Sequence, residues 1–123
     1  MAKIRIAVPS ALPGGLDAPV YPHFGHCDIY TVVDLDNGHL SAVRALPNVP
    51  HADGGCMGPV NHLAGYGVNV LIAGGMGMRP LMGLNQAGIA VYYGAGAPNV
   101  QAAVQAFIAG SLPEFAPVNT CSG

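Results

Sequence analysis

The stretch that decides the fold is residues 28–46, DIYTVVDLDNGHLSAVRAL. Two runs rich in β-branched and aromatic residues flank Asn37 and Gly38. An Asn-Gly pair supplies the positive φ angles that a type I′ turn requires. The stretch therefore predicts two antiparallel strands joined by a two-residue turn.

The chain before this hairpin predicts one strand and one long loop. Residues 3–9, KIRIAVP, alternate polar and apolar and then become wholly apolar, as in a strand that enters a sheet. Residues 10–26 hold three Pro and three Gly, which neither a helix nor a strand sustains. Loops of this length in compact domains are usually functional or mobile.

Helices and strands alternate after the hairpin. Gly and Pro residues mark the boundaries, and the run VNVLIAGG has no polar alternation, as in a strand buried on both faces. In the last helix, an apolar stripe is predicted to be buried, formed by Val100, Val104, Phe107 and Ile108. The pattern predicts helices at 58–66, 79–87 and 97–110 and strands at 68–75 and 89–95.

This order of elements predicts an α/β fold, a three-layer α/β/α sandwich. Right-handed crossovers extend the sheet on one side of the first strand, and the hairpin extends it on the other. We expect a mixed five-stranded sheet with strand order 3-2-1-4-5 and strand 2 antiparallel. Residues 1–110 form the expected domain, and residues 111–123 a loosely held tail.

Composition excludes several classes of function. Charged residues make up 8% of the chain and the formal net charge is −2, so no basic surface for nucleic acid or an anionic membrane is expected. We expect no membrane span, because no apolar run approaches the roughly 18 residues that one needs. The first residues do not resemble a secretory signal, so a cytoplasmic location is expected, where three cysteines are rarely a disulfide framework.

The predicted topology gathers soft-metal donors at one end of the domain. Ligands of open α/β sheets bind outside the carboxyl ends of the parallel strands, and a reversed strand 2 begins at that same edge. His39, in the hairpin turn, falls at the opposite end. Imidazole, thiolate and thioether groups favour Cu(I), Zn or sulfur-bridged Fe and Mo species over Mg or Ca. The donors expected at the edge are His23, His26, Cys27, His51, Cys56, Met57, Met76 and Met78.

Simpler readings of several donors remain open. Free cysteine is among the most buried residue types, so Cys27 suits the core as well as a ligand role. Met76 and Met78 suit the packing of a helix on the sheet. His23 and His26 are harder to assign to a core, since Pro22 and Gly25 bracket them in a turn with little apolar surface.

The segments HFGHCDIYTVVD (23–34) and ADGGCMGPVNHLAGYGVNVLIAGGMGMRPLMGLNQAGIAVYYGA (52–95) resemble the dinitrogenase iron–molybdenum cofactor-binding family. That family includes NifX, NafY, the C-terminal domain of NifB and the molybdenum–copper orange protein. The resemblance runs from Lys3 to about Gly110. It implies a ribonuclease H-like fold that carries or delivers a metal–sulfur cluster to cofactor-assembly proteins without catalysis.

The resemblance also implies which residues line the cluster. In the family, the HFG segment opens strand 2 and the glycine-rich loops line the site, whereas His26, Cys27, Cys56 and Met57 are additions of this chain. These additions leave several cargoes open: an iron–molybdenum, molybdenum–copper or iron–sulfur cluster, or a soft metal such as Cu or Zn. The implied cofactor-binding residues are Phe24, Gly25, Gly54, Gly55, Gly74, Gly75, Met76 and Met78.

Three functions are compatible with these patterns. The first is a non-catalytic carrier of a metal–sulfur cluster. The second is a thiol redox or hydrolytic enzyme that uses Cys27 or Cys56 with His51. The third is a protein–protein adaptor, because 51% hydrophobic content leaves apolar surface for a partner or for a homodimer. A two-metal nuclease is disfavoured, since too few carboxylates cluster.

Overall fold

The hairpin turn forms as predicted. Asn37 has a φ angle of 55° and Gly38 one of 81°, and they join β2 (Ile29–Asp36) to β3 (His39–Pro47). The computed structural model describes residues 3–24, 27–48, 57–94 and 96–116.

The sheet has the predicted order and directions. Its order is β3-β2-β1-β4-β5; β2 runs antiparallel to both neighbours, and β4 and β5 run parallel to β1. The remaining strands are β1 (Lys3–Ser10), β4 (Val70–Ala73) and β5 (Ala90–Tyr93). The prediction of a mixed five-stranded sheet is therefore confirmed.

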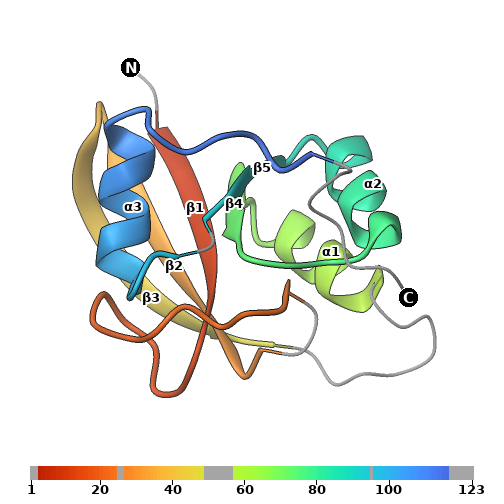
Figure 1. The fold of residues 1–123 in the computed structure, drawn as a ribbon, viewed down its shortest axis with the longest axis horizontal. Helices are drawn as coiled ribbons and strands as arrows, with labels where there is room; N and C mark the ends of the chain where they lie inside the picture. Colours follow the sequence, from red (N-terminus) through yellow and green to blue (C-terminus); the bar gives the residue numbers. More distant parts are fainter. Residues whose placement is uncertain (1–2, 25–26, 49–56, 95, 117–123) are drawn as a thin grey trace.

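Three helices complete the layers. α3 (Val100–Ile108) packs on one face of the sheet, while α1 (Met57–Gly65) and α2 (Met78–Gln86) lie on the other (Figure 1). Asn99 caps α3, since its side chain accepts a hydrogen bond from the Ala102 N–H at 2.9 Å. Among the described helices, none has the length and apolarity needed to cross a bilayer.

Each face of the sheet has its own hydrophobic core. The core beneath α3 includes Ile6, Val8 and Val104, whereas the core beneath α1 and α2 includes Leu63, Leu71 and many further side chains. The predicted stripe of α3 is wrong at Ile108, which is 47% exposed. The reason is that the buried face of α3 runs through Val100, Ala103 and Val104, and the helix ends at Ile108.

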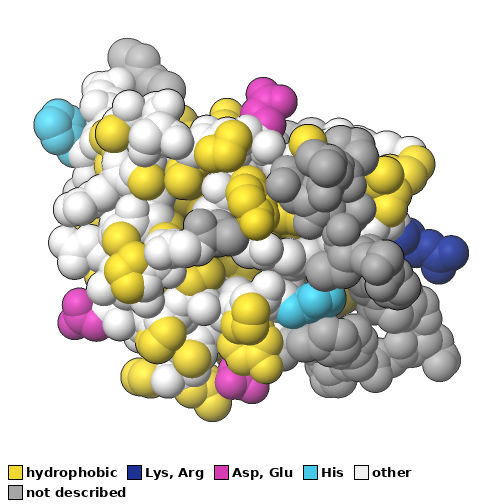
Figure 2. Space-filling model, viewed as in Figure 1, with side chains coloured by type: hydrophobic (Ala, Val, Ile, Leu, Met, Phe, Trp, Pro, Cys, Tyr) yellow, Lys and Arg dark blue, Asp and Glu magenta, His cyan; other side chains and the backbone are white. Residues whose placement is uncertain are grey.

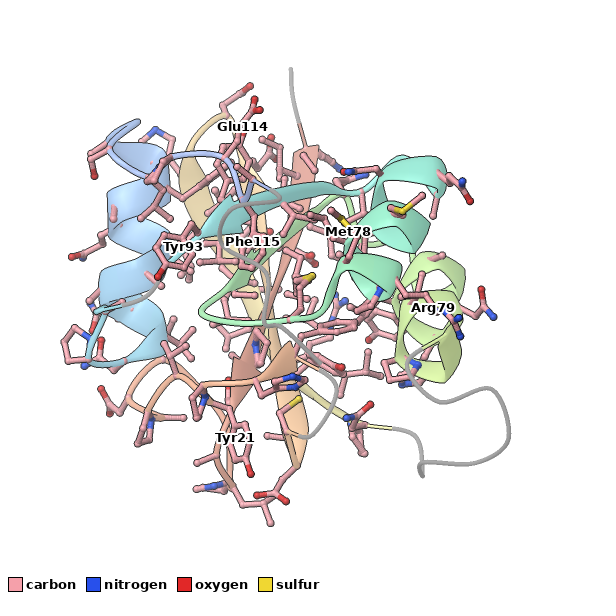
Figure 3. All side chains as sticks on the ribbon, turned by 45° about the vertical axis from the view of Figure 1, so that its right-hand side comes forward. Tyr21, Met78, Arg79, Tyr93, Glu114 and Phe115 are labelled. Carbon is pink, nitrogen blue, oxygen red and sulfur yellow. The ribbon has the colours of Figure 1, made fainter. Side chains whose placement is uncertain are left out.

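Part of the expected tail is held against the sheet. The Tyr93 N–H donates to the Pro113 carbonyl at 2.8 Å, and the Phe115 N–H donates to the Val91 carbonyl at 2.9 Å. Phe115 is buried and its ring contacts that of Tyr93 edge-on at 5.5 Å (Figure 3). The expectation of a loose tail therefore does not describe residues 113–115, because β5 is an edge strand that offers unpaired backbone groups there.

An ionic cluster joins β1, β2 and β3 at the end of the sheet near the hairpin turn. Arg5 Nε and Asp34 Oδ1 are 2.9 Å apart, and Arg44 Nη2 lies 3.1 Å from Asp34 Oδ2. Arg5 also donates to the Tyr66 carbonyl at 2.8 Å and lies over the Tyr66 ring. The hydrogen bond from Arg5 lowers the pKa of Asp34 below its usual value.

This cluster predicts a pH-dependent contribution to stability. The pKa of Asp34 is lower in the folded than in the unfolded chain, so its contribution is complete above the unfolded pKa of about 4 and is lost as the pH falls. We expect Asp34→Asn to lower the free energy of unfolding by about 1 kcal/mol at pH 7. Urea denaturation at several pH values measures this difference, which should shrink toward pH 2. A constant difference across that range would contradict the assignment.

Candidate functional site

The carboxyl edge of the sheet brings together the ends of four strands. β1 ends at Ser10, β4 at Ala73 and β5 at Tyr93, and β2 begins at Ile29 beside Ser10. His39 lies at the opposite end, paired with Asp36. The predicted meeting of these strand ends at one edge is thus confirmed, whereas the residues that form the site stay a prediction.

A backbone hydrogen bond joins two of the predicted site segments. The Phe24 N–H donates to the Gly75 carbonyl at 2.9 Å. It places His23 and Phe24, from the loop before β2, against the glycine-rich turn between β4 and α2. Residues far apart in the sequence therefore meet at this edge.

A pocket of about 190 Å³ opens beside this contact. At Gly94 a Cβ atom would collide with the Ile72 side chain, so the close approach of β5 to β4 requires glycine. Among the described residues, no charged side chain lines the pocket, whose walls there are Tyr21, backbone and small or apolar groups. It is lined by Val20, Tyr21, Pro22, Gly74, Gly94, Gly96 and Ala97.

Sequence reasoning assigned Gly74 to the site but not Tyr21 or Gly94. A signal for Gly94 was available, because it directly follows a parallel strand at the edge where ligands bind. Tyr21 had no such signal. Its place depends on the Tyr21 N–H bond to the Pro9 carbonyl, at 2.8 Å, which folds the loop back along β1.

Phe24 and Cys27 face the core. Phe24 is fully buried, and Cys27 is 4% exposed. The Cys27 thiol donates to the Phe24 carbonyl at 3.5 Å, and Asn48 Nδ2 donates to the Cys27 carbonyl at 2.9 Å. Burial raises the pKa of Cys27 to about 11, so the group is a thiol at neutral pH. Its role as a metal ligand stays a prediction.

The methionines of the site divide between core and surface. Met76 is fully buried, whereas Met78, the first residue of α2, is 43% exposed. Met57 begins α1. Figure 3 shows Met78 and Arg79 at α2, with Arg79 projecting away from the sheet. Met76 therefore fills space beneath the glycine-rich turn, and Met78 is accessible at its rim.

Arg79 provides positive charge at this end. Of the four Lys and Arg residues in the chain, Lys3 and Arg5 line a groove with Asp34 at the other end, and Arg44 pairs with Asp34. Arg79 lies in the first turn of α2, whose N-cap residue Gly77 makes no side-chain hydrogen bond to the helix. An exposed arginine beside an open helix N-terminus favours an anion.

Several predicted residues lie outside the described part of the chain: Gly25, His26, His51, Gly54, Gly55 and Cys56. Within residues 3–24, 27–48, 57–94 and 96–116, no three His, Cys, Asp or Glu side chains lie close enough to hold a metal ion. The metal-ligand set that we predicted from the sequence thus stays a prediction.

Comparison with known proteins identifies relatives across most of the chain. The apo form of the orange protein from Desulfovibrio gigas is 33% identical, with a TM-score of 0.78, over 91% of this chain and 92% of that one. A candidate NifB protein from Thermotoga, solved by NMR, is 30% identical, with a TM-score of 0.76, over 98% and 97%.

Sequence comparison agrees with the structural relatives. An uncharacterized protein of Methanocaldococcus jannaschii is 27% identical over 96 residues, which are 76% of this chain and 80% of that protein. The family described as dinitrogenase iron-molybdenum cofactor matches residues 2–110. This chain therefore belongs to the dinitrogenase iron-molybdenum cofactor family.

Proposed function

We propose that the protein is a non-catalytic carrier that binds an anionic metal–sulfur cluster, or its precursor, at the carboxyl edge of the sheet. The observation that carries the proposal is the hydrogen bond between the Phe24 N–H and the Gly75 carbonyl. It joins the two segments that carry the family resemblance, and it lies beside the pocket lined by Tyr21, Gly74 and Gly94. The names of the relatives, a NifB protein and the orange protein, support the same class of cargo.

The charge and shape of the site suit a cargo of this kind. Sulfido clusters and thiometalates are anions with soft sulfur surfaces, and backbone N–H groups at a helix N-terminus stabilise anions. Gly74 and Gly94, which have no side chains, form part of the described wall of the pocket. Arg79 supplies a positive charge in the first turn of α2, directly after the glycine-rich turn, while the predicted ligands His23, His26 and Cys56 would supply soft donors.

The adaptor alternative lacks a comparable observation. The most exposed large apolar side chains of the described residues are divided among the first loop, β3, α2 and α3. They are Leu12, Leu40 with Val43, Met78 with Met82, and Ile108, respectively. Figure 2 shows one face of the molecule, on which hydrophobic side chains are scattered among backbone and other side chains. A homodimer stays a prediction, as do assembly proteins that would receive the cargo.

The thiol-enzyme alternative is disfavoured for Cys27. A nucleophilic or redox cysteine needs an accessible thiolate, whereas the Cys27 thiol is buried and its pKa is raised to about 11. The side chains of Tyr30 and Asn48 interact with this thiol. Cys56 lies outside the described residues.

Arg79 gives the first test of the carrier proposal. Anaerobic titration with tetrathiomolybdate, a molybdenum–sulfur anion, should show saturable binding by its absorbance. Arg79→Glu should weaken this binding about tenfold at low salt, because reversing one exposed charge costs roughly 1–2 kcal/mol, and the effect should shrink as salt screens it. Lys3→Glu changes the net charge equally at the opposite end and should have little effect. Equal weakening by both variants would contradict a localised site.

His23 gives a second test, with His39 as its control. If His23 is a soft donor of the site, His23→Ala should weaken binding of Cu(I) in the presence of tetrathiomolybdate by at least about tenfold. His39→Ala removes the same group from the hairpin end and should leave the affinity unchanged. Competition with a coloured Cu(I) chelator measures both. Unchanged affinity in His23→Ala would remove this residue from the ligand set.

The raised pKa of Cys27 predicts how stability depends on alkaline pH. The unfolded chain loses the thiol proton near pH 9 and the folded chain near pH 11, so folding is progressively disfavoured as the pH rises between these values. We expect the wild type to lose about 2 kcal/mol more than Cys27→Ala over this interval. Denaturant unfolding at each pH measures the difference, and parallel curves would show that Cys27 is not buried as a thiol.

A further inference from the structure

The Phe24 peptide is held from two directions. Its N–H donates to the Gly75 carbonyl at 2.9 Å, and its carbonyl accepts a hydrogen bond from the Tyr30 hydroxyl at 3.0 Å. The first bond leads to the glycine-rich turn after β4, and the second leads to the sheet. The Cys27 thiol donates to the same carbonyl at a longer 3.5 Å.

Tyr30 lies in a strand that is paired on both sides. It lies in β2, where it pairs with Pro9 of β1 and with Leu46 of β3. Its side chain is fully buried, and its ring contacts that of Phe24 with centroids 5.8 Å apart. The Tyr30 hydroxyl therefore links Phe24, in the loop before β2, to a residue whose position is fixed by β1, β2 and β3.

We propose that Tyr30 is a positioning residue for the cluster site. Through the Phe24 carbonyl, it holds the His23–Phe24 segment against the glycine-rich turn, and thereby fixes the relative position of Pro22 and Gly74, which line the adjacent pocket. This inference rests on the proposed function. It assigns a role to a residue that touches neither the pocket nor the expected cargo.

A simpler role for the hydroxyl exists. A buried tyrosine needs a hydrogen-bond partner, since an unsatisfied hydroxyl is costly, and the Phe24 carbonyl satisfies it. In that case Tyr30→Phe would change only global stability. A positioning role makes a different prediction, because it loosens one contact of the site more than contacts elsewhere.

The test compares two backbone hydrogen bonds in Tyr30→Phe, which keeps the buried ring and removes only the hydroxyl. Native-state hydrogen exchange reads the Phe24 amide, which bonds to Gly75, and the Asn69 amide, which bonds to the Arg5 carbonyl at 2.9 Å at the opposite end. We expect exchange at Phe24 to accelerate about tenfold more than at Asn69, as loss of one buried hydrogen bond allows. Tyr66→Phe is the matched control and should leave the ratio of the Phe24 and Asn69 exchange rates unchanged.

Release of tetrathiomolybdate gives the functional readout. Tyr30→Phe should release it several-fold to about tenfold faster than the wild type, and Tyr66→Phe at the wild-type rate. Equal acceleration of both amides, or unchanged release despite selective loosening at Phe24, would overturn the proposal. If the wild type binds no tetrathiomolybdate, the carrier function itself fails, and the exchange comparison alone decides whether Tyr30 holds Phe24.

A second measurement covers the case in which Tyr30→Phe does not fold. In the wild type, binding of tetrathiomolybdate should slow exchange of the Phe24 amide relative to the Asn69 amide, because cargo in the adjacent pocket stabilises the Phe24–Gly75 hydrogen bond that Tyr30 positions. Equal protection of both amides would overturn the positioning role.

Discussion

The reversed direction of β2 is the constraint on which the site depends. The Asn37-Gly38 turn makes β2 antiparallel to β3, and the pairing of Lys3 with Asp36 through Ser10 with Ile29 makes it antiparallel to β1. A parallel β2 would begin at the other end of the sheet. Because it is reversed, the loop that carries His23 and Phe24 arrives where β4 and β5 end, and the Phe24–Gly75 hydrogen bond becomes possible.

The described part of the site is built from backbone and buried side chains more than from polar side chains that reach into the pocket. Phe24 contributes its peptide to the contact with Gly75 and its ring to the core. Gly94 has no side chain, so its backbone can lie directly against the Ile72 side chain. Such a frame is stiff, since core packing leaves few alternative arrangements. In the proposed function, this stiffness fixes the separation of the loops that hold the cargo.

The sequence was informative where local chemistry decides the structure. The turn at Asn37-Gly38, the apolar run of β4 and the crossover rules predict the sheet order and the end at which the site lies. Burial at strand ends was less predictable, because Cys27 is held by Asn48, which lies 21 residues further along the chain. The pairing of residues 113–115 with β5 is likewise non-local, and no motif near Phe115 signals it.

A carrier must hold its cargo and also release it, and the placement of charge in this site suits both needs. A buried arginine would bind an anion tightly, since the low dielectric strengthens the attraction. Arg79 is instead exposed in the first turn of α2, where solvent and salt weaken its attraction. The Cys27 thiol, a soft donor that lies in the described core with Met76, keeps its proton at neutral pH. In the proposed function, the described backbone and core therefore fix the position and shape of the pocket. The predicted donors His26, His51 and Cys56 govern how tightly the metal is held.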